Sequence, residues 1–287
     1  AVADEHMEFL KDIDTVAKEE LSLVKFSKQT IINMDLVEQK HIAEFLEPSA
    51  IFETVGKSKL NDYLLTSQRT NLGRLKLNVK SKDGKFMVES ETHMLGEHSL
   101  TALALASVVA HKLGLSVTKI EQAINNYNNP PGRMNVLDGI KDSVIIDDTY
   151  NSSPAAVSAA LDTLKSMKHG RSKMRRIAVL GDMLELGRLS VEEHRKIGAQ
   201  VAKCADSLVT VGFRARDIAE SALSNGMADQ NILQYEDSLK AGQELQNLID
   251  EHDVVLVKGS QSMRMERIVE DCMLEPEKAK DLLVRQD

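Results

Sequence analysis

A short apolar run that ends in two carboxylates and leads into a helix is the feature that most constrains this fold. Residues 144–146 are all Val or Ile, which is typical of a buried strand in a parallel sheet. The polar segment 147–153 follows, and Pro154 then opens a segment with helical apolar spacing, with Ser153 as a candidate N-cap. A strand, a polar loop and a helix in this order predict one turn of an α/β fold, in which ligands bind at the carboxyl ends of strands.

The loop after this strand offers acids, hydroxyls and an amide to a polar ligand. Its side chains are Asp147, Asp148, Thr149, Tyr150, Asn151, Ser152 and Ser153. The alternative is a capped strand-to-helix turn whose acids are solvated.

The same alternation continues to the end of the chain and predicts a doubly wound α/β domain. Strands are expected near 134–138, 143–147, 176–180, 207–211 and 253–257, and helices near 154–168, 190–204, 214–224, 238–250 and 262–272. Polar loops containing Asp182 and Lys258 follow two further strands, so the loops could converge on one crevice. Lys258 and Arg264 near a helix start would suit an anionic substrate, whereas taken singly they are ordinary surface charges.

The first part of the chain has a different pattern. Helices are expected at 13–26, 37–45, 98–113 and 117–127, strands at 30–33 and 51–55, and antiparallel strands within 72–95 around the turn at Asp83-Gly84. The breaker cluster 128–133 separates the two patterns, so we expect domains at 1–130 and 131–287.

Composition and missing motifs exclude several classes of function. The net charge of −8 and an aromatic content of 3% argue against a nucleic-acid-binding surface. No segment predicts a membrane span or a signal peptide, and Cys204 and Cys272 are expected to be reduced core residues of a cytoplasmic protein. Gly56-Lys57-Ser58 is not a phosphate-binding loop, because position 51 is Ile rather than Gly, and no strand end carries the dinucleotide-binding glycine pattern.

Several motifs, in order along the chain, resemble those of the Mur ligases, in particular the type that adds D-alanyl-D-alanine. They are Glu5-His6-Met7-Glu8, Ala17-Lys18 with Glu20, Gly96 with His98, Pro131-Gly132-Arg133, Asp147-Asp148-Thr149-Tyr150-Asn151, Leu180-Gly181-Asp182-Met183-Leu184-Glu185-Leu186-Gly187, Val257-Lys258-Gly259-Ser260 and Met263-Arg264-Met265-Glu266. The resemblance implies an α/β fold: the later part of a central ATPase domain, followed by a Rossmann-like C-terminal domain. The family's UDP-binding domain and phosphate-binding loop have no counterpart in this sequence.

The resemblance also implies a reaction and its participants. ATP would phosphorylate the carboxylate of UDP-N-acetylmuramoyl-tripeptide, and D-alanyl-D-alanine would attack the acyl phosphate, with Mg²⁺ spreading the phosphate charge. His6 and Lys18 would be catalytic residues and metal ligands, Lys18 as a carbamate. Arg133, Asp148, Tyr150 and Asn151 would hold the nucleotide, with Arg133 also catalytic, and Asp182, Lys258 and Ser260 would border the acceptor site. Read without the family, Lys18 is an ordinary helix-surface lysine and His6 a loop histidine.

Two positions depart from the family pattern and leave an alternative open. Ser99 and Ala102 stand where the family has asparagines that help to hold adenine. We expect a monomeric ligase of cell-wall precursor synthesis, seen here as a fragment that does not turn over alone, since the phosphate-binding loop is missing from the sequence. The alternative is a non-catalytic peptide- or nucleotide-binding module derived from such a ligase, and the same chemistry with another amino-acid acceptor also stays open.

Overall fold

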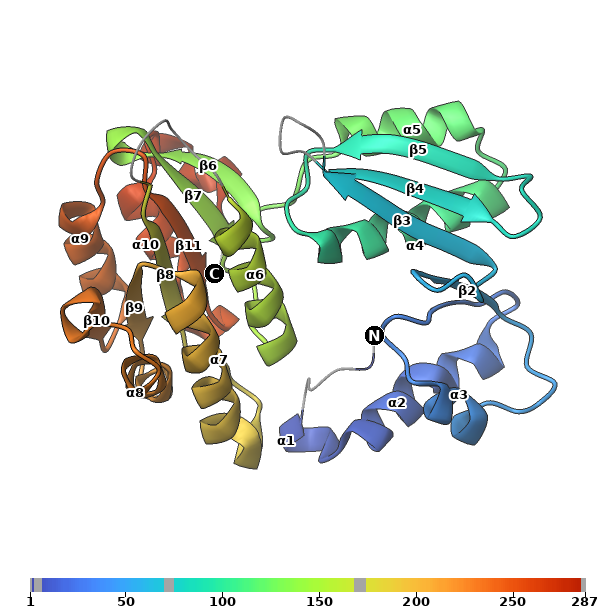
Figure 1. The fold of residues 1–287 in the computed structure, drawn as a ribbon, viewed down its shortest axis with the longest axis horizontal. Coiled ribbons are helices and arrows are strands. Elements are labelled where there is room, and N and C mark those ends of the chain that lie inside the picture. The colour runs from blue at the N-terminus through green and yellow to red at the C-terminus, as the bar shows by residue number, and fades with distance from the viewer. Residues whose placement is uncertain (1, 3–6, 70–74, 168–173, 285–287) are drawn as a thin grey trace. The chain divides into compact units, whose positions relative to one another are not determined.

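The chain divides into two compact units, residues 1–128 and 129–287, in the computed structural model (Figure 1). The structure describes residue 2 and residues 7–69, 75–167 and 174–284. None of the helices among these residues has the length and apolar character that a bilayer crossing requires.

The first unit is built on a five-stranded mixed sheet with the order β1-β2-β3-β4-β5. Its strands are β1 (Ile31–Asn33), β2 (Glu53–Gly56), β3 (Tyr63–Arg69), β4 (Leu75–Ser81) and β5 (Met87–Thr92). β1, β2 and β3 pair in parallel, whereas β3, β4 and β5 are antiparallel. Leu75, Leu77 and Val79 alternate toward the core, which confirms the antiparallel strands predicted from this pattern.

The helices of the first unit form two cores. They are α1 (Met7–Leu10), α2 (Ile13–Ser22), α3 (Gln39–Phe45), α4 (Glu97–Lys112) and α5 (Val117–Asn126). α4 and α5 bury their apolar faces against the sheet, around Leu77 and Phe86. A smaller cluster joins Leu21, Ile32 and Leu46 from α2, β1 and the end of α3. The single helix predicted over 13–26 is wrong in its last turn, because Leu23–Phe26 form a 3-10 helix.

The second unit has a six-stranded sheet with the order β10-β9-β8-β11-β7-β6. The strands are β6 (Asn135–Gly139), β7 (Ser143–Asp148), β8 (Arg176–Gly181), β9 (Ser207–Val211), β10 (Ile232–Tyr235) and β11 (Val254–Lys258). β6 is antiparallel to β7, and all other neighbours pair in parallel. The five strands predicted for this part are therefore confirmed, and β10 is an additional edge strand.

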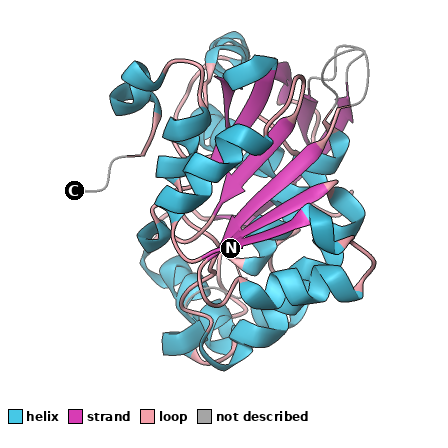
Figure 2. Cartoon of the chain, turned by 90° about the vertical axis from the view of Figure 1, so that its left-hand side faces the viewer, coloured by secondary structure: helices cyan, strands magenta, loops and turns pink. Residues whose placement is uncertain are grey.

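Helices cover both faces of this second sheet (Figure 2). They are α6 (Pro154–Ser166), α7 (Ser190–Cys204), α8 (Arg216–Ser224), α9 (Ser238–Leu248), α10 (Glu266–Cys272) and the short α11 (Ala279–Leu282). α6, α7 and α8 pack side by side, and α9 packs against α10. The chain moves outward from β7 to β10 and then returns to β11, between β8 and β7. Right-handed crossovers in opposite directions place their helices on opposite faces, which gives the predicted doubly wound fold.

The helix starts show where sequence periodicity fails. The helix predicted from 262 begins at Glu266, because Gln261–Met263 form a 3-10 turn and Arg264 has a left-handed φ of 55°. Cys204 and Cys272 are buried and free, as expected for core cysteines. Burial raises the pKa of the Cys272 thiol to about 12.

Candidate functional site

The carboxyl end of β7 carries a buried acid, Asp147, that binds neutral donors. Asp147 Oδ2 accepts a hydrogen bond from the Gly132 N–H at 2.9 Å, and Oδ1 accepts one from the Thr149 hydroxyl at 2.6 Å. The Thr149 N–H lies 3.3 Å from the same Oδ1. Burial disfavours the charged carboxylate more than these bonds favour it, so the pKa of Asp147 is raised to about 6.

The next acid, Asp148, forms a buried ion pair with Lys258. Parallel pairing of β7 and β11 sets these two residues opposite each other. Lys258 Nζ lies 2.7 Å from Asp148 Oδ2 and also donates to the Asn151 carbonyl at 2.9 Å. The Met134 N–H donates to Asp148 Oδ1 at 3.1 Å. The positive charge of Lys258 is therefore neutralised inside the unit, and its side chain is only 3% exposed.

The same two acids fasten the segment 132–134 to the end of β7. Besides the bonds from Gly132 and Met134, the Tyr150 N–H donates to the Gly132 carbonyl at 3.0 Å. Gly132 has a φ of +71°, and a Cβ there would lie 2.2 Å from Val284 Cγ2. This position therefore requires glycine for both its backbone conformation and its packing.

Arg133, between the two fastened residues, presents an exposed cation. Its guanidinium lies 4.0 Å from the centre of the Tyr150 ring, and Tyr150 is 39% exposed. A guanidinium stacked on an aromatic ring is held in one plane while its N–H groups stay free to bind an oxyanion. This arrangement suits phosphate groups, because the planar fork can bind two oxygens at once.

The ends of β8 and β11 form a second polar group. Asp182 Oδ1 accepts from the Ala215 N–H at 2.8 Å, and the Asp182 carbonyl accepts from the Ser260 N–H at 3.0 Å. Ser260 Oγ in turn accepts from the Leu184 N–H at 2.9 Å. Gly181 and Gly259 allow the close approach, since a Cβ on Gly181 would lie 3.3 Å from the Gly259 Cα. The loop after β8 is thus tied to the loop after β11.

The structure places the sequence-predicted site residues in different settings. Asp148, Lys258, Arg133, Tyr150 and Asn151 meet at the end of β7, while Asp182 and Ser260 meet at the ends of β8 and β11. Lys18 lies exposed on α2 of the first unit, and His6 lies outside the described residues.

Two residues that the sequence did not single out for a role contribute contacts. Gly132 supplies a donor to Asp147, and His194 of α7 binds the N–H of Met183. Gly132 stands in the breaker cluster, which was a usable signal, whereas a lone histidine within a helix gives none.

Metal-binding side chains cluster elsewhere. Within the described ranges, the side chains that could together hold a cation are those of Asp142, Glu251 and His252. Asp142 precedes β7 and His252 precedes β11, so this group lies at the amino ends of those strands, opposite the polar loops. Two of its three members are exposed, and acids at a surface often gather without a metal.

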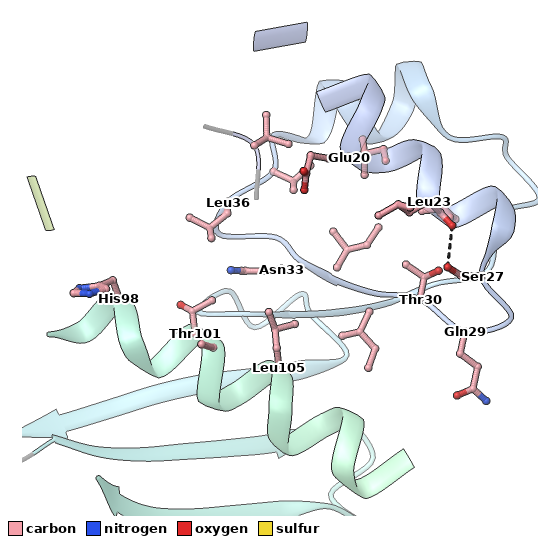
Figure 3. Close-up of a pocket in the computed structure, with 17 residues that line it drawn as sticks. Glu20, Leu23, Ser27, Gln29, Thr30, Asn33, Leu36, His98, Thr101 and Leu105 are labelled. Carbon is pink, nitrogen blue, oxygen red and sulfur yellow. Dashed lines mark hydrogen bonds between the residues drawn. The ribbon is translucent and has the colours of Figure 1, made fainter. Parts of the chain in front are cut away.

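The first unit contains a pocket of about 520 Å³ between α2, β1 and α4 (Figure 3). Figure 3 shows His98, Thr101 and Leu105 on α4 facing Leu23 and Glu20 across the space, with Asn33 between them. Most of its lining residues are apolar, and Ala102 is among them. The Ser99 hydroxyl donates to the Leu95 carbonyl at 2.6 Å, so it is already engaged within α4.

Comparison with known proteins identifies relatives of this chain. Residues 132–261 match the family model described as Mur ligase, glutamate ligase domain. The UDP-N-acetylmuramoyl-tripeptide–D-alanyl-D-alanine ligase of Bacillus subtilis is 24% identical over 276 residues, which cover 96% of this chain and 58% of that protein. The Escherichia coli ligase of the same name is 26% identical over 227 residues, which cover 75% of this chain and 47% of that protein. This chain thus spans less than two thirds of the length of these relatives.

Solved structures agree at the level of the fold. The MurF ligase of Thermotoga maritima in complex with ADP superposes with a TM-score of 0.75 at 23% identity, covering 97% of this chain and 61% of that one. The UDP-N-acetylmuramate-alanine ligase of the same organism gives a TM-score of 0.63 at 17% identity, covering 93% and 56%. Residues 132–261 of the second unit thus match a Mur ligase domain, and most of the chain is similar in sequence to proteins named as UDP-N-acetylmuramoyl-tripeptide–D-alanyl-D-alanine ligases.

Proposed function

We propose that this chain supplies part of the catalytic apparatus of an ATP-dependent ligase that adds D-alanyl-D-alanine to UDP-N-acetylmuramoyl-tripeptide. Residues 1–130 would be the later part of a central ATP-binding domain, and residues 131–287 a Rossmann-like C-terminal domain. Similarity to ligases of this name over 96% of the chain supports the proposal. The observation that carries it is the exposed Arg133 stacked on Tyr150 beside Asp148, at the carboxyl end of a strand.

The proposed reaction has two steps, and both develop negative charge on phosphate. A carboxylate oxygen takes the γ-phosphoryl group of ATP, which yields an acyl phosphate and ADP. The amine of the dipeptide then displaces phosphate to form an amide. Arg133 suits both steps, because a guanidinium can bind two phosphate oxygens and stays protonated. Stacking on Tyr150 restricts its orientation before the ligand arrives, which lowers the entropic cost of binding.

The neighbouring side chains have supporting roles in this proposal. Asp148 is held by Lys258 and the Met134 N–H, and a carboxylate held in this way can still accept a hydrogen bond from a hydroxyl of the nucleotide sugar. Asn151 exposes its side chain beside it. Asp182 and Ser260 would border the acceptor dipeptide, since their loops leave the adjacent strands.

The magnesium assignment rests on the resemblance. Carbamylation of Lys18 would turn a cation into an oxygen ligand that would hold a hard metal, and such a metal would supply positive charge to the phosphate groups. Lys18 lies exposed on α2, and the part of the chain that the structure describes gathers no set of metal ligands around it.

Titration of ADP into the full chain, followed by calorimetry, tests the proposal. Binding should be weak, because the sequence has no phosphate-binding loop, and Arg133→Met should weaken it about ten-fold or more, as expected for a charged hydrogen bond. Arg216→Met is a matched control, since Arg216 also lies over an aromatic ring, that of Phe213, at 5.3 Å. ADP binding that Arg133→Met leaves unchanged, or that both substitutions weaken equally, would contradict the assignment.

A non-catalytic binding module is the second candidate. It is favoured by Ser99, whose hydroxyl is engaged with Leu95, and by the apolar Ala102. Calorimetry with D-alanyl-D-alanine, with and without ADP, separates the two candidates. A ligase should bind the dipeptide more tightly when nucleotide is present, whereas a module should bind either ligand independently.

A further inference from the structure

A fully buried histidine joins α7 to the loop that follows β8. The Met183 N–H donates to His194 Nε2 at 3.0 Å, and His194 Nδ1 lies 2.7 Å from the Ser190 carbonyl oxygen. Both His194 and Met183 are completely buried. The ring therefore bridges the first turn of α7 and the backbone of the loop at residues 182–186.

These contacts fix the protonation state of the ring. Nε2 accepts a hydrogen bond from a backbone N–H, so it carries no proton. Nδ1 must then carry the proton in order to donate to the Ser190 carbonyl. The imidazolium ion has an N–H at both positions, and its Nε2–H would face the Met183 N–H directly. Protonation of His194 is thus incompatible with this loop geometry.

The surroundings of the ring oppose its protonation. Burial lowers the pKa of His194, although Asp182 at the end of β8 and Asp217 of α8 act in the opposite direction. Arg214, which precedes α8, adds to the lowering, and the bond to the Ser190 carbonyl partly offsets it. The neutral ring is therefore the form present at neutral pH, and it is lost only as the pH falls below the ordinary value of 6.5.

The loop that His194 holds is under conformational constraint. Glu185 has a φ of 61°, in the left-handed region that a side chain disfavours. Asp182 and Leu184 are fastened by Ala215 and Ser260, and Met183 lies between them with its N–H on the histidine. Loss of that bond would bury an unpaired N–H, which is costly enough to move the loop.

We propose that His194 is a positioning residue that latches the loop 182–186 while its ring is neutral and releases it when the ring gains a proton. If the proposed function is correct, the latch orders the border of the acceptor site, so acid should weaken the hold on the dipeptide. The proposal itself concerns the loop and can be tested without any ligand.

Nitrogen NMR of the histidine ring and hydrogen exchange of the Met183 amide, both on the full chain, test the latch. At pH 7.5 the ring should be the Nδ1–H tautomer, and the corrected protection of the Met183 amide should fall about five-fold or more at an acid pH where the same NMR titration shows the ring to be protonated, the loss of one hydrogen bond. His194→Gln keeps an acceptor that does not titrate, so the protection of the Met183 amide in this variant should be independent of pH. His194→Ala should lose protection at both pH values, and His252→Gln should behave as the unsubstituted chain.

The possible outcomes separate the latch from the proposed function. An Nε2–H tautomer, or equal Met183 protection at both pH values in the unsubstituted chain, would overturn the latch. The unsubstituted chain and His194→Gln decide the question even if His194→Ala fails to fold. A working latch in a chain that binds no D-alanyl-D-alanine at either pH would support the latch and count against the proposed function.

Discussion

Replacing Lys258 by methionine should destabilise the second unit severely, because it leaves Asp148 as an unpaired buried charge. The Nζ to Oδ2 distance is 2.7 Å, and the two side chains are 3% and 11% exposed. Methionine has similar length and volume, so the substitution removes the charge without opening a large cavity. Asp148 would keep the Met134 N–H as a partner. Removal of one member of a buried ion pair costs about 3–5 kcal/mol of unfolding free energy.

A double-mutant cycle isolates the pair from the other contacts of its members. Asp148→Asn should also destabilise, since it removes the negative charge that neutralises the buried Lys258 ammonium. The double variant should recover at least about 2 kcal/mol relative to the sum of the single changes, because no buried charge is left unpaired. Urea unfolding followed by circular dichroism measures this, since the sequence has no Trp for fluorescence.

An exposed ion pair in the same unit provides the control. Lys278 Nζ lies 2.6 Å from Glu275 Oε1, and both side chains are about half exposed. Lys278→Met should change the unfolding free energy far less than Lys258→Met does, because solvent screens such pairs. If Lys258→Met lowers the unfolding free energy no more than Lys278→Met does, burial does not increase the dependence of Asp148 on its partner. That result would refute the prediction.

Three further outcomes follow from the same site and core. The raised pKa of Asp147 means that the folded state binds a proton more tightly than the unfolded chain, so this residue favours folding below about pH 4 and loses up to about 3 kcal/mol of that contribution as the pH rises to 7. The unfolding free energy of the unsubstituted chain should therefore fall over this range relative to that of Asp147→Asn. A difference between the two that does not change with pH would refute the raised pKa. Gly132→Ala should lower the melting temperature more than Gly84→Ala, since both positions have a left-handed φ but only the first lacks space for a Cβ; equal effects would show that Val284 moves aside easily. Cys272 should resist a thiol reagent at pH 8 until urea unfolds the chain, because its thiol is buried with a pKa raised to about 12, and rapid native labelling would contradict this.

The strands of the second unit were predictable because a buried parallel strand is a continuous β-branched run. The strand expected at 143–147 is Ser143–Asp148, and the strand expected at 176–180 is Arg176–Gly181. β3 and β10 were not predicted, because their sequences lack such a run. β10 is a four-residue edge strand that is mostly half-buried, and β3 is buried only in its first half, so neither carries a clear period.

The sequence predicted which site residues follow the strands, because the ends of the strands could be predicted. Parallel strands bring their carboxyl ends to one edge, so the position of Asp148, Asp182, Lys258 and Ser260 at this edge follows from the alternation of elements. The pairing of Lys258 with Asp148 does not follow, because it requires β11 to insert between β8 and β7. That order depends on where the chain reverses its direction across the sheet, which no local pattern encodes.

The buried pair changes which cation at this edge can meet an anionic ligand. A lysine after a strand and beside a helix suggests a phosphate contact, but Lys258 Nζ is occupied by Asp148 and the Asn151 carbonyl. An anion would have to displace Asp148 and desolvate its own charge in order to reach it, at a cost of several kcal/mol. Within the described ranges no carboxylate pairs with Arg133, whose guanidinium stacks on the Tyr150 ring and keeps its donors in the plane of the stack. Lys258 therefore holds the loop that carries Tyr150 and Asn151, and this occupied lysine is the reason why we propose Arg133, rather than Lys258, as the phosphate-binding cation.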